Sequence, residues 1–122
     1  MLFRSGAGGT APRIGPGGMV VNVHLGVGDP RDRVRTESFF KVFEVHLEEG
    51  KTYQIDLERK GEIDPFLRLE TATGTELAFN DDFGGTLDSR IEFRPSSTGT
   101  YRVICTTYRP ASGDMVLRVQ ER

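Results

Sequence analysis

Five side chains in the middle of the chain have the residue types that a hard cation requires. They are Asp64, Asn80, Asp81, Asp82 and Asp88. Calcium binds about six to eight oxygen atoms, and carboxylates together with backbone carbonyls are its usual protein ligands. The same kinds of side chain also cap turns by hydrogen bonding to the backbone. The residues therefore leave two interpretations open, a calcium site and a set of turn caps. The spacing lacks the bidentate Glu of an EF-hand loop.

Two alternating stretches lie between Asp64 and Asn80 and predict a β-hairpin. Leu67 and Leu69 share one face of a first strand, and Leu77 and Phe79 share one face of a second. We expect both pairs to face one core. The turn between the strands is predicted at 73–75, because Gly74 supplies the positive φ that tight turns need.

This hairpin would bring the acidic residues together at one end of a sheet. The predicted pairing places Leu67 opposite Asn80, and Asp64 therefore near the two residues that follow Asn80. The next loop returns through two glycines and leads to Asp88, just before a strand predicted at 90–94. The predicted calcium site thus consists of Asp64, Asn80, Asp81, Asp82 and Asp88.

Short alternating stretches continue along most of the chain, with turn residues between them and no helical period. About eight strands of this kind predict an all-β fold, a single antiparallel β-sandwich over residues 20–122. Outside the hairpin the expected inward-facing residues are Val21, Val23, Leu25, Phe39, Phe43, Val45, Leu47, Tyr53, Ile55, Leu57, Tyr101, Val103, Cys105, Met115, Leu117 and Val119. Residues 1–19 are rich in Gly and Pro, without hydrophobic periodicity, and are predicted to be a flexible leader or linker.

The composition narrows the class of protein. The 122 residues suffice for one domain with its own core. A net charge of −2 provides no basic surface for nucleic acid, and no apolar run is long enough to insert into a membrane. Cys105 is the single cysteine, so an internal disulfide is impossible.

The sequence favours a protein without catalytic activity. His24 and His46 fall on polar strand faces, with no neighbouring Cys or His at zinc-ligand spacing. Neither histidine is expected near Asp64, Asp88 or Ser89, so no Ser-His-Asp arrangement is predicted. Cys105 is expected to be buried, where a thiol packs as a small hydrophobic group.

Several segments resemble one known family. They are DPFLRLE at 64–70, NDD at 80–82, DSRIEF at 88–93, TGTYRVICTTY at 98–108 and SGDMVLRV at 112–119. Together they resemble the bacterial pre-peptidase C-terminal domain over roughly residues 20–119. The resemblance implies a jelly-roll-like β-sandwich that serves as an accessory module of secreted or cell-surface bacterial proteins, mostly peptidases. That family is similar in fold to the collagen-binding modules of bacterial collagenases, some of which bind calcium, so calcium is the expected cofactor.

The expected function is that of a non-catalytic accessory module. Its partners would be a catalytic or other domain of the parent protein, or an extracellular polymer or protein. The predicted binding face carries Phe66, Arg68, Arg102 and Tyr108, because rigid aromatic rings and Arg side chains give contact area at low ordering cost. Two alternatives stay open: a purely structural spacer or interaction domain, and a small hydrolase that uses the acidic residues.

Overall fold

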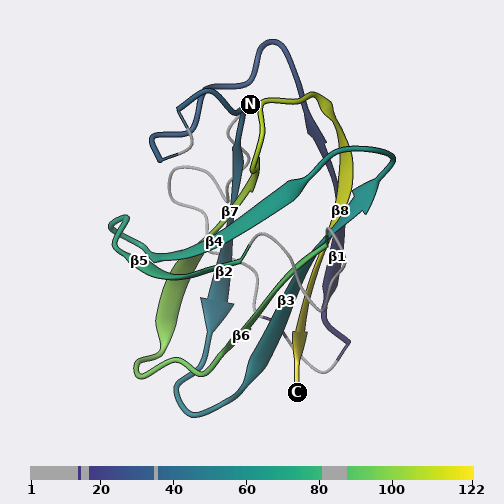
Figure 1. The fold of residues 1–122 in the computed structure, drawn as a ribbon. Helices are drawn as coiled ribbons and strands as arrows, with labels where there is room; N and C mark the ends of the chain where they lie inside the picture. The colour runs from purple at the N-terminus through teal and green to yellow at the C-terminus, as the bar shows by residue number, and fades with distance from the viewer. Residues whose placement is uncertain (1–13, 15–16, 35, 81–87) are drawn as a thin grey trace.

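The chain folds into two packed antiparallel sheets of four strands each (Figure 1). The computed structural model describes residues 14, 17–34, 36–80 and 88–122. Within these residues it contains eight strands and no helix: β1 (Met19–Leu25), β2 (Lys41–Leu47), β3 (Tyr53–Lys60), β4 (Pro65–Thr71), β5 (Glu76–Asn80), β6 (Ser89–Phe93), β7 (Gly99–Thr107) and β8 (Gly113–Glu121).

The strand order identifies the architecture as a jelly roll. One sheet has the order β1-β8-β3-β6 and the other has β2-β7-β4-β5, so neighbours within a sheet are mostly distant in sequence. Every pairing between these strands is antiparallel. Two four-stranded sheets connected in this way form a double-sheet jelly roll. The predicted all-β sandwich of about eight strands is confirmed.

The core lies between the two sheets and is formed by the alternating apolar residues. All the inward positions predicted outside the hairpin belong to the core cluster or pack against it, as do Leu67 and Leu69. Cys105 is fully buried there, and this burial raises the pKa of its thiol well above the ordinary range. The thiol is therefore uncharged at neutral pH and packs as an apolar group.

The β4–β5 hairpin has the predicted turn and pairing, but the side chains of β5 face the opposite side of the sheet from the prediction. Gly74 has a φ of 97°, and Leu67 lies opposite Asn80 as expected. Residues directly opposite in an antiparallel pair point to the same side. Phe79 lies opposite Arg68 and is therefore on the outer face, while Ala78 packs against the core. The prediction that Leu77 and Phe79 face the core is wrong, because pairing Leu67 with Asn80 excludes it.

The structure also describes part of the segment predicted to be a leader. Strand β1 begins at Met19, one residue before the predicted start of the domain. Ile14 is buried in the core cluster. At least one side chain from residues 1–19 therefore contributes to the packing of the sandwich.

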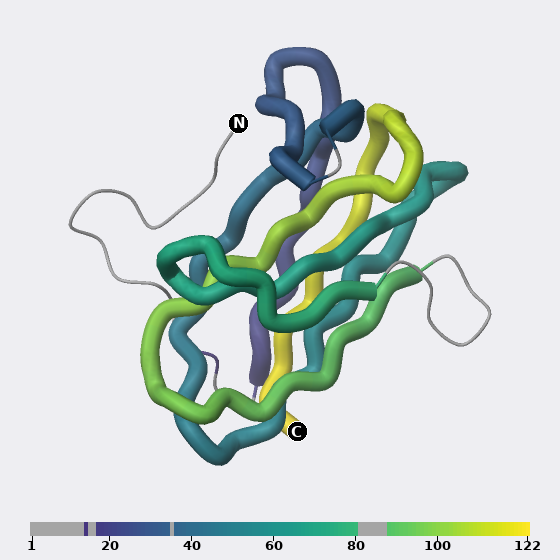
Figure 2. Tube along the Cα trace, turned by 60° about the vertical axis from the view of Figure 1, so that its left-hand side comes forward, coloured from purple at the N-terminus to yellow at the C-terminus, as the bar shows by residue number. Residues whose placement is uncertain are grey.

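The loop between β1 and β2, residues 26–40, covers part of the outer face of the β2-β7-β4-β5 sheet. Its Asp32 forms a two-point ion pair with Arg68 of β4, with both Nη–Oδ distances 2.7 Å. Each side chain is only 1 % exposed. The loop is closed by a hydrogen bond from the Asp32 amide to the Ser38 carbonyl. Figure 2 shows this blue loop at the same end of the molecule as the yellow-green turn between β7 and β8.

Glu70 is a second buried carboxylate that bonds to Arg68. Its carboxylate accepts hydrogen bonds from Arg68 at 3.2 Å, Arg33 at 3.0 Å and Arg102 at 3.3 Å. Burial alone would lower the pKa of Arg68, but the hydrogen bonds and negative charges of Asp32 and Glu70 raise it. The Arg68 guanidinium is therefore charged, and its charge is compensated inside the protein.

We predict that Arg68→Met destabilises the protein by about 3–5 kcal/mol, because it leaves Asp32 as a buried carboxylate without its partner. Urea unfolding monitored by circular dichroism measures the change. Adding Asp32→Leu should recover part of the loss, because the buried charge is then removed.

Arg118→Met is the matched control for this prediction. Arg118 forms an ion pair with Glu58 at 3.1 Å, but both side chains are more than a third exposed. Its loss should cost less than about 1 kcal/mol. An Arg68→Met variant as stable as Arg118→Met would show that the buried pair does not hold the loop in place.

Candidate functional site

Three aromatic rings form a stack on the outer face of the β2-β7-β4-β5 sheet. Phe66 of β4 lies between Phe79 of β5 and Tyr108, which directly follows β7. The ring centroids of Phe66 and Phe79 are 5.9 Å apart with planes at 4°, and those of Phe66 and Tyr108 are 6.4 Å apart at 19°. Phe66 is buried, whereas Phe79 is 61 % and Tyr108 40 % exposed. The stack is thus supported from within and presents two aromatic side chains to solvent.

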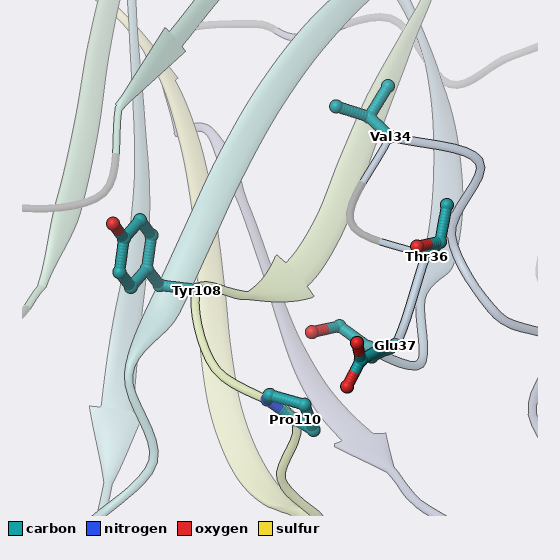
Figure 3. A pocket seen from close by; sticks show the side chains of 6 residues that line it. Val34, Thr36, Glu37, Tyr108 and Pro110 are labelled. Atoms are coloured by element: carbon teal, nitrogen blue, oxygen red, sulfur yellow. The ribbon is translucent and has the colours of Figure 1, made fainter.

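A pocket adjoins this stack at Tyr108. It is lined by two segments that are distant in sequence and has a volume of about 270 Å³. Figure 3 shows Tyr108 and Pro110 on one side, and Val34, Thr36 and Glu37 of the β1–β2 loop on the other. Ser38 also lines the pocket and is buried. The walls are therefore partly apolar, with one carboxylate, that of Glu37.

The four residues of the predicted binding face do lie on the outer side of one sheet, but they differ in accessibility. Arg68 is not accessible to a ligand, because the β1–β2 loop covers it and Asp32 pairs with it. Phe66 is also buried, between its two aromatic neighbours. Arg102 is a quarter exposed and bonded to Glu70. Of the four, Tyr108 has the most accessible position, and the ligand-binding role of the face stays a prediction.

The predicted calcium ligands are only partly described. Asp81 and Asp82 lie outside the described residues. Asp64 directly precedes β4, Asn80 ends β5, and Asp88 directly precedes β6. The Ser89 hydroxyl donates to the Pro65 carbonyl at 2.9 Å, and the Arg90 amide donates to Asn80 Oδ1 at 3.4 Å. These bonds connect the adjoining strand ends, so the three residues occupy one end of the sandwich.

One of these residues bonds to a neighbouring strand. Asp88 Oδ1 accepts a hydrogen bond from the amide of Arg59 in β3 at 2.9 Å, which is a contact between strands and not a turn cap. Among the described residues, no three or more His, Cys, Asp and Glu side chains are placed to share a metal ion. The calcium site, which includes Asp81 and Asp82, therefore stays a prediction.

The described residues contain a His-Asp pair that sequence analysis did not predict. His24 Nδ1 lies 2.7 Å from Asp114 Oδ1, across the β1–β8 pair. Their side chains are 66 % and 63 % exposed. In Ser-His-Asp triads the Asp is buried and holds the imidazole in one orientation. The exposed pair has no such support, so it does not indicate a nucleophilic site.

The main features of the surface that sequence analysis missed are Phe79 and the pocket. The alternation of side chains along a strand predicts that Phe79 is on the outer face, because pairing Leu67 with Asn80 already places Phe79 opposite Arg68. No such signal exists for the pocket. Its lining residues come from 34–38 and 108–110, which only the tertiary fold brings together.

Comparisons with known proteins identify the fold. The sequence matches no protein-family model and no curated protein. Among solved structures, the pre-peptidase C-terminal domain of a collagenase from Bacillus anthracis is similar, with 19 % sequence identity and a TM-score of 0.62 over 90 % of this chain and 94 % of that chain. PliG from Aeromonas hydrophila, a periplasmic lysozyme inhibitor of g-type lysozyme, has 12 % identity and a TM-score of 0.58 over 93 % and 96 % of the two chains.

Both similarities cover nearly the whole length of each chain, so the likeness concerns the complete sandwich. The sequence identities are low, and the likeness therefore concerns the fold. The resemblance found in the sequence agrees with this result. The chain has the fold of the pre-peptidase C-terminal domain.

Proposed function

We propose that this chain is a non-catalytic accessory module that binds a protein or polymer partner through the aromatic stack and its adjoining pocket. The observation that carries the proposal is the grouping of exposed apolar side chains on one sheet and on the loop that covers it. Phe79 and Tyr108 contact Phe66 in the stack, and Val34, which is 51 % exposed, lines the pocket with Tyr108. Contiguous exposed apolar groups of this kind mark interaction surfaces.

The construction of this surface also supports a binding role. Aromatic rings bury a large area on contact and lose little conformational freedom when they bind. Phe79 and Tyr108 are held by stacking on a buried ring, so little further ordering is needed. Both similar structures support a role without catalysis, one as the pre-peptidase C-terminal domain of a collagenase and the other as a lysozyme inhibitor.

The proposal includes export from the cell. The sequence resembles modules of secreted bacterial proteins, and one of the similar structures is described as periplasmic. In the described part of the chain, no helix has the length and apolar character needed to cross a membrane.

The first test of this proposal is direct binding. We expect the protein to bind at least one of three immobilised ligands, namely fibrillar collagen, g-type lysozyme and peptidoglycan, measured by surface plasmon resonance or cosedimentation. Phe79→Ser and Tyr108→Ser should each weaken binding by about tenfold or more, because central aromatic contacts dominate interfaces. Both positions are exposed, so the variants should remain folded.

Val20→Ser is the matched control. Val20 is 59 % exposed on β1, in the opposite sheet, and its replacement should leave binding unchanged. Equal losses in all three variants, or no loss in the two aromatic variants, would contradict the assignment of the surface. Failure to bind any of the ligands would favour the structural spacer.

The second test concerns catalysis. We expect no turnover of peptide, ester or glycoside substrates by the purified protein, because the His24–Asp114 pair is exposed and lacks the buried Asp that orients the histidine of a catalytic triad. Chromogenic and fluorogenic assays measure this at high protein concentration. Turnover that is lost in Asp88→Ala or in His24→Ala would show that the hydrolase alternative is correct.

We propose in addition that calcium stabilises the end of the sandwich where Asp64, Asn80 and Asp88 lie, with Asp81 and Asp82 as further ligands. Support comes from the oxygen-rich residue types and from the adjacent strand ends. A ligand that binds only the folded state adds about 2.7 kcal/mol of stability at a hundredfold excess over its Kd. Melting temperature should therefore rise by an amount on the order of 10 °C in calcium relative to chelator.

Magnesium and one variant provide the controls for this prediction. Magnesium should raise the melting temperature less, because it requires a tighter octahedral set of ligands. Asp88→Asn keeps an oxygen that can accept from the Arg59 amide, so it removes the charge while retaining this hydrogen bond. The variant should lose much of the calcium response. Identical melts in chelator and in millimolar calcium would show that these residues have structural roles only.

A further inference from the structure

We propose that the pocket beside Tyr108 receives a single lysine or arginine side chain from a protein partner. This inference rests on the proposed function and specifies the partner's chemistry. The pocket is mainly polar. It combines the hydroxyls of Thr36 and Ser38 and the carboxylate of Glu37 with apolar groups of Val34, Tyr108 and Pro110. A side chain with an apolar stem and a cationic end is complementary to both features.

The size of the pocket suits one side chain. Its volume of about 270 Å³ lies below the range of roughly 300–1,000 Å³ that is usual for pockets of drug-sized ligands. It adjoins the exposed aromatic stack through Tyr108, which belongs to both. A protein that covers the stack is therefore in position to insert a side chain into the pocket.

The Glu37 carboxylate is available for such a ligand. Within the described part of the chain it has no hydrogen-bond or ion-pair partner. Arg31 lies close by but does not bond to this carboxylate: it donates to the backbone carbonyl of Glu37 at 2.9 Å, and its guanidinium lies 5.0 Å from the ring centre of Phe39. A cation entering the pocket could form a charge-assisted hydrogen bond with this carboxylate.

The position of Glu37 is fixed by the fold of the loop. The hydrogen bond between the Asp32 amide and the Ser38 carbonyl closes the segment that carries Glu37. Asp32 is in turn anchored to Arg68 of β4. The carboxylate therefore sits on a segment attached to the sheet, so less ordering is required when a ligand binds.

The test uses capped tripeptides in which the central residue alone varies. Acetyl-Gly-Xaa-Gly-amide peptides carry arginine, lysine, citrulline or norleucine at Xaa, and are titrated into the ¹⁵N-labelled protein. We expect the arginine and lysine peptides to shift the amide resonances of residues 36–38 and 108–109 in a saturable manner. Citrulline has nearly the shape of arginine without its charge, and should bind about tenfold more weakly, as expected for the loss of a charged hydrogen bond.

Glu37→Gln tests the carboxylate itself. It preserves size and hydrogen-bonding capacity, and Glu37 is exposed, so the fold should be retained. Binding of the arginine peptide should weaken by about tenfold. Glu49→Gln is the control, because Glu49 is exposed in the turn after β2, at the opposite end of the sheet, and its replacement should have no effect.

Several results would overturn the inference. They are equal binding of the arginine and citrulline peptides, unchanged binding in Glu37→Gln, and shifts confined to other parts of the protein. The experiments distinguish failure of this inference from failure of the proposed function. If Phe79→Ser and Tyr108→Ser abolish binding of a partner while Glu37→Gln leaves it intact, the interaction surface is correct and the basic-side-chain pocket is not.

Discussion

The ion pair between Asp32 and Arg68 is the interaction on which the surface of this protein depends. Removing both charges from water costs several kcal/mol per ion, and two short, parallel hydrogen bonds together with the contact of Arg68 with Glu70 help to compensate for this cost. An interaction of this kind is sensitive to geometry. It therefore fixes where the β1–β2 loop sits on the β2-β7-β4-β5 sheet, and with the loop it fixes one wall of the pocket.

The same sheet consequently has two kinds of outer surface. Where the loop crosses it, Arg68 and Glu70 are buried and their charges are satisfied within the protein. Beside the loop, the sheet presents Phe79 and Tyr108, with Phe66 between them. An uncompensated charge next to these rings would retain water and oppose burial of the aromatic surface. The internal pairing of Arg68 therefore favours contact between the aromatic residues and a partner.

Much of the fold is predictable from the sequence because it depends on the alternation of apolar and polar residues within each strand. Leu67 and Leu69 face the core as their spacing requires, and the hairpin turns at Gly74 as expected. The apolar character of Phe79 favours the core face, but strand pairing places this residue on the outer face. Alternation predicts the outer face for Arg68, but its burial depends on Asp32, 36 residues away in sequence. Nothing in the local pattern around either residue identifies that partner.

The candidate site was less predictable than the fold for a related reason. A strand can be recognised from a few consecutive residues, but the pocket exists only because a loop near residue 36 meets the turn near residue 109. The loop reaches that position through Asp32, and the turn reaches it through the end of β7, which pairs with β4. Both walls are thus attached to the same pair of central strands. A ligand that enters between them meets surfaces already in place, so most of its contact energy is available for binding rather than for ordering the protein.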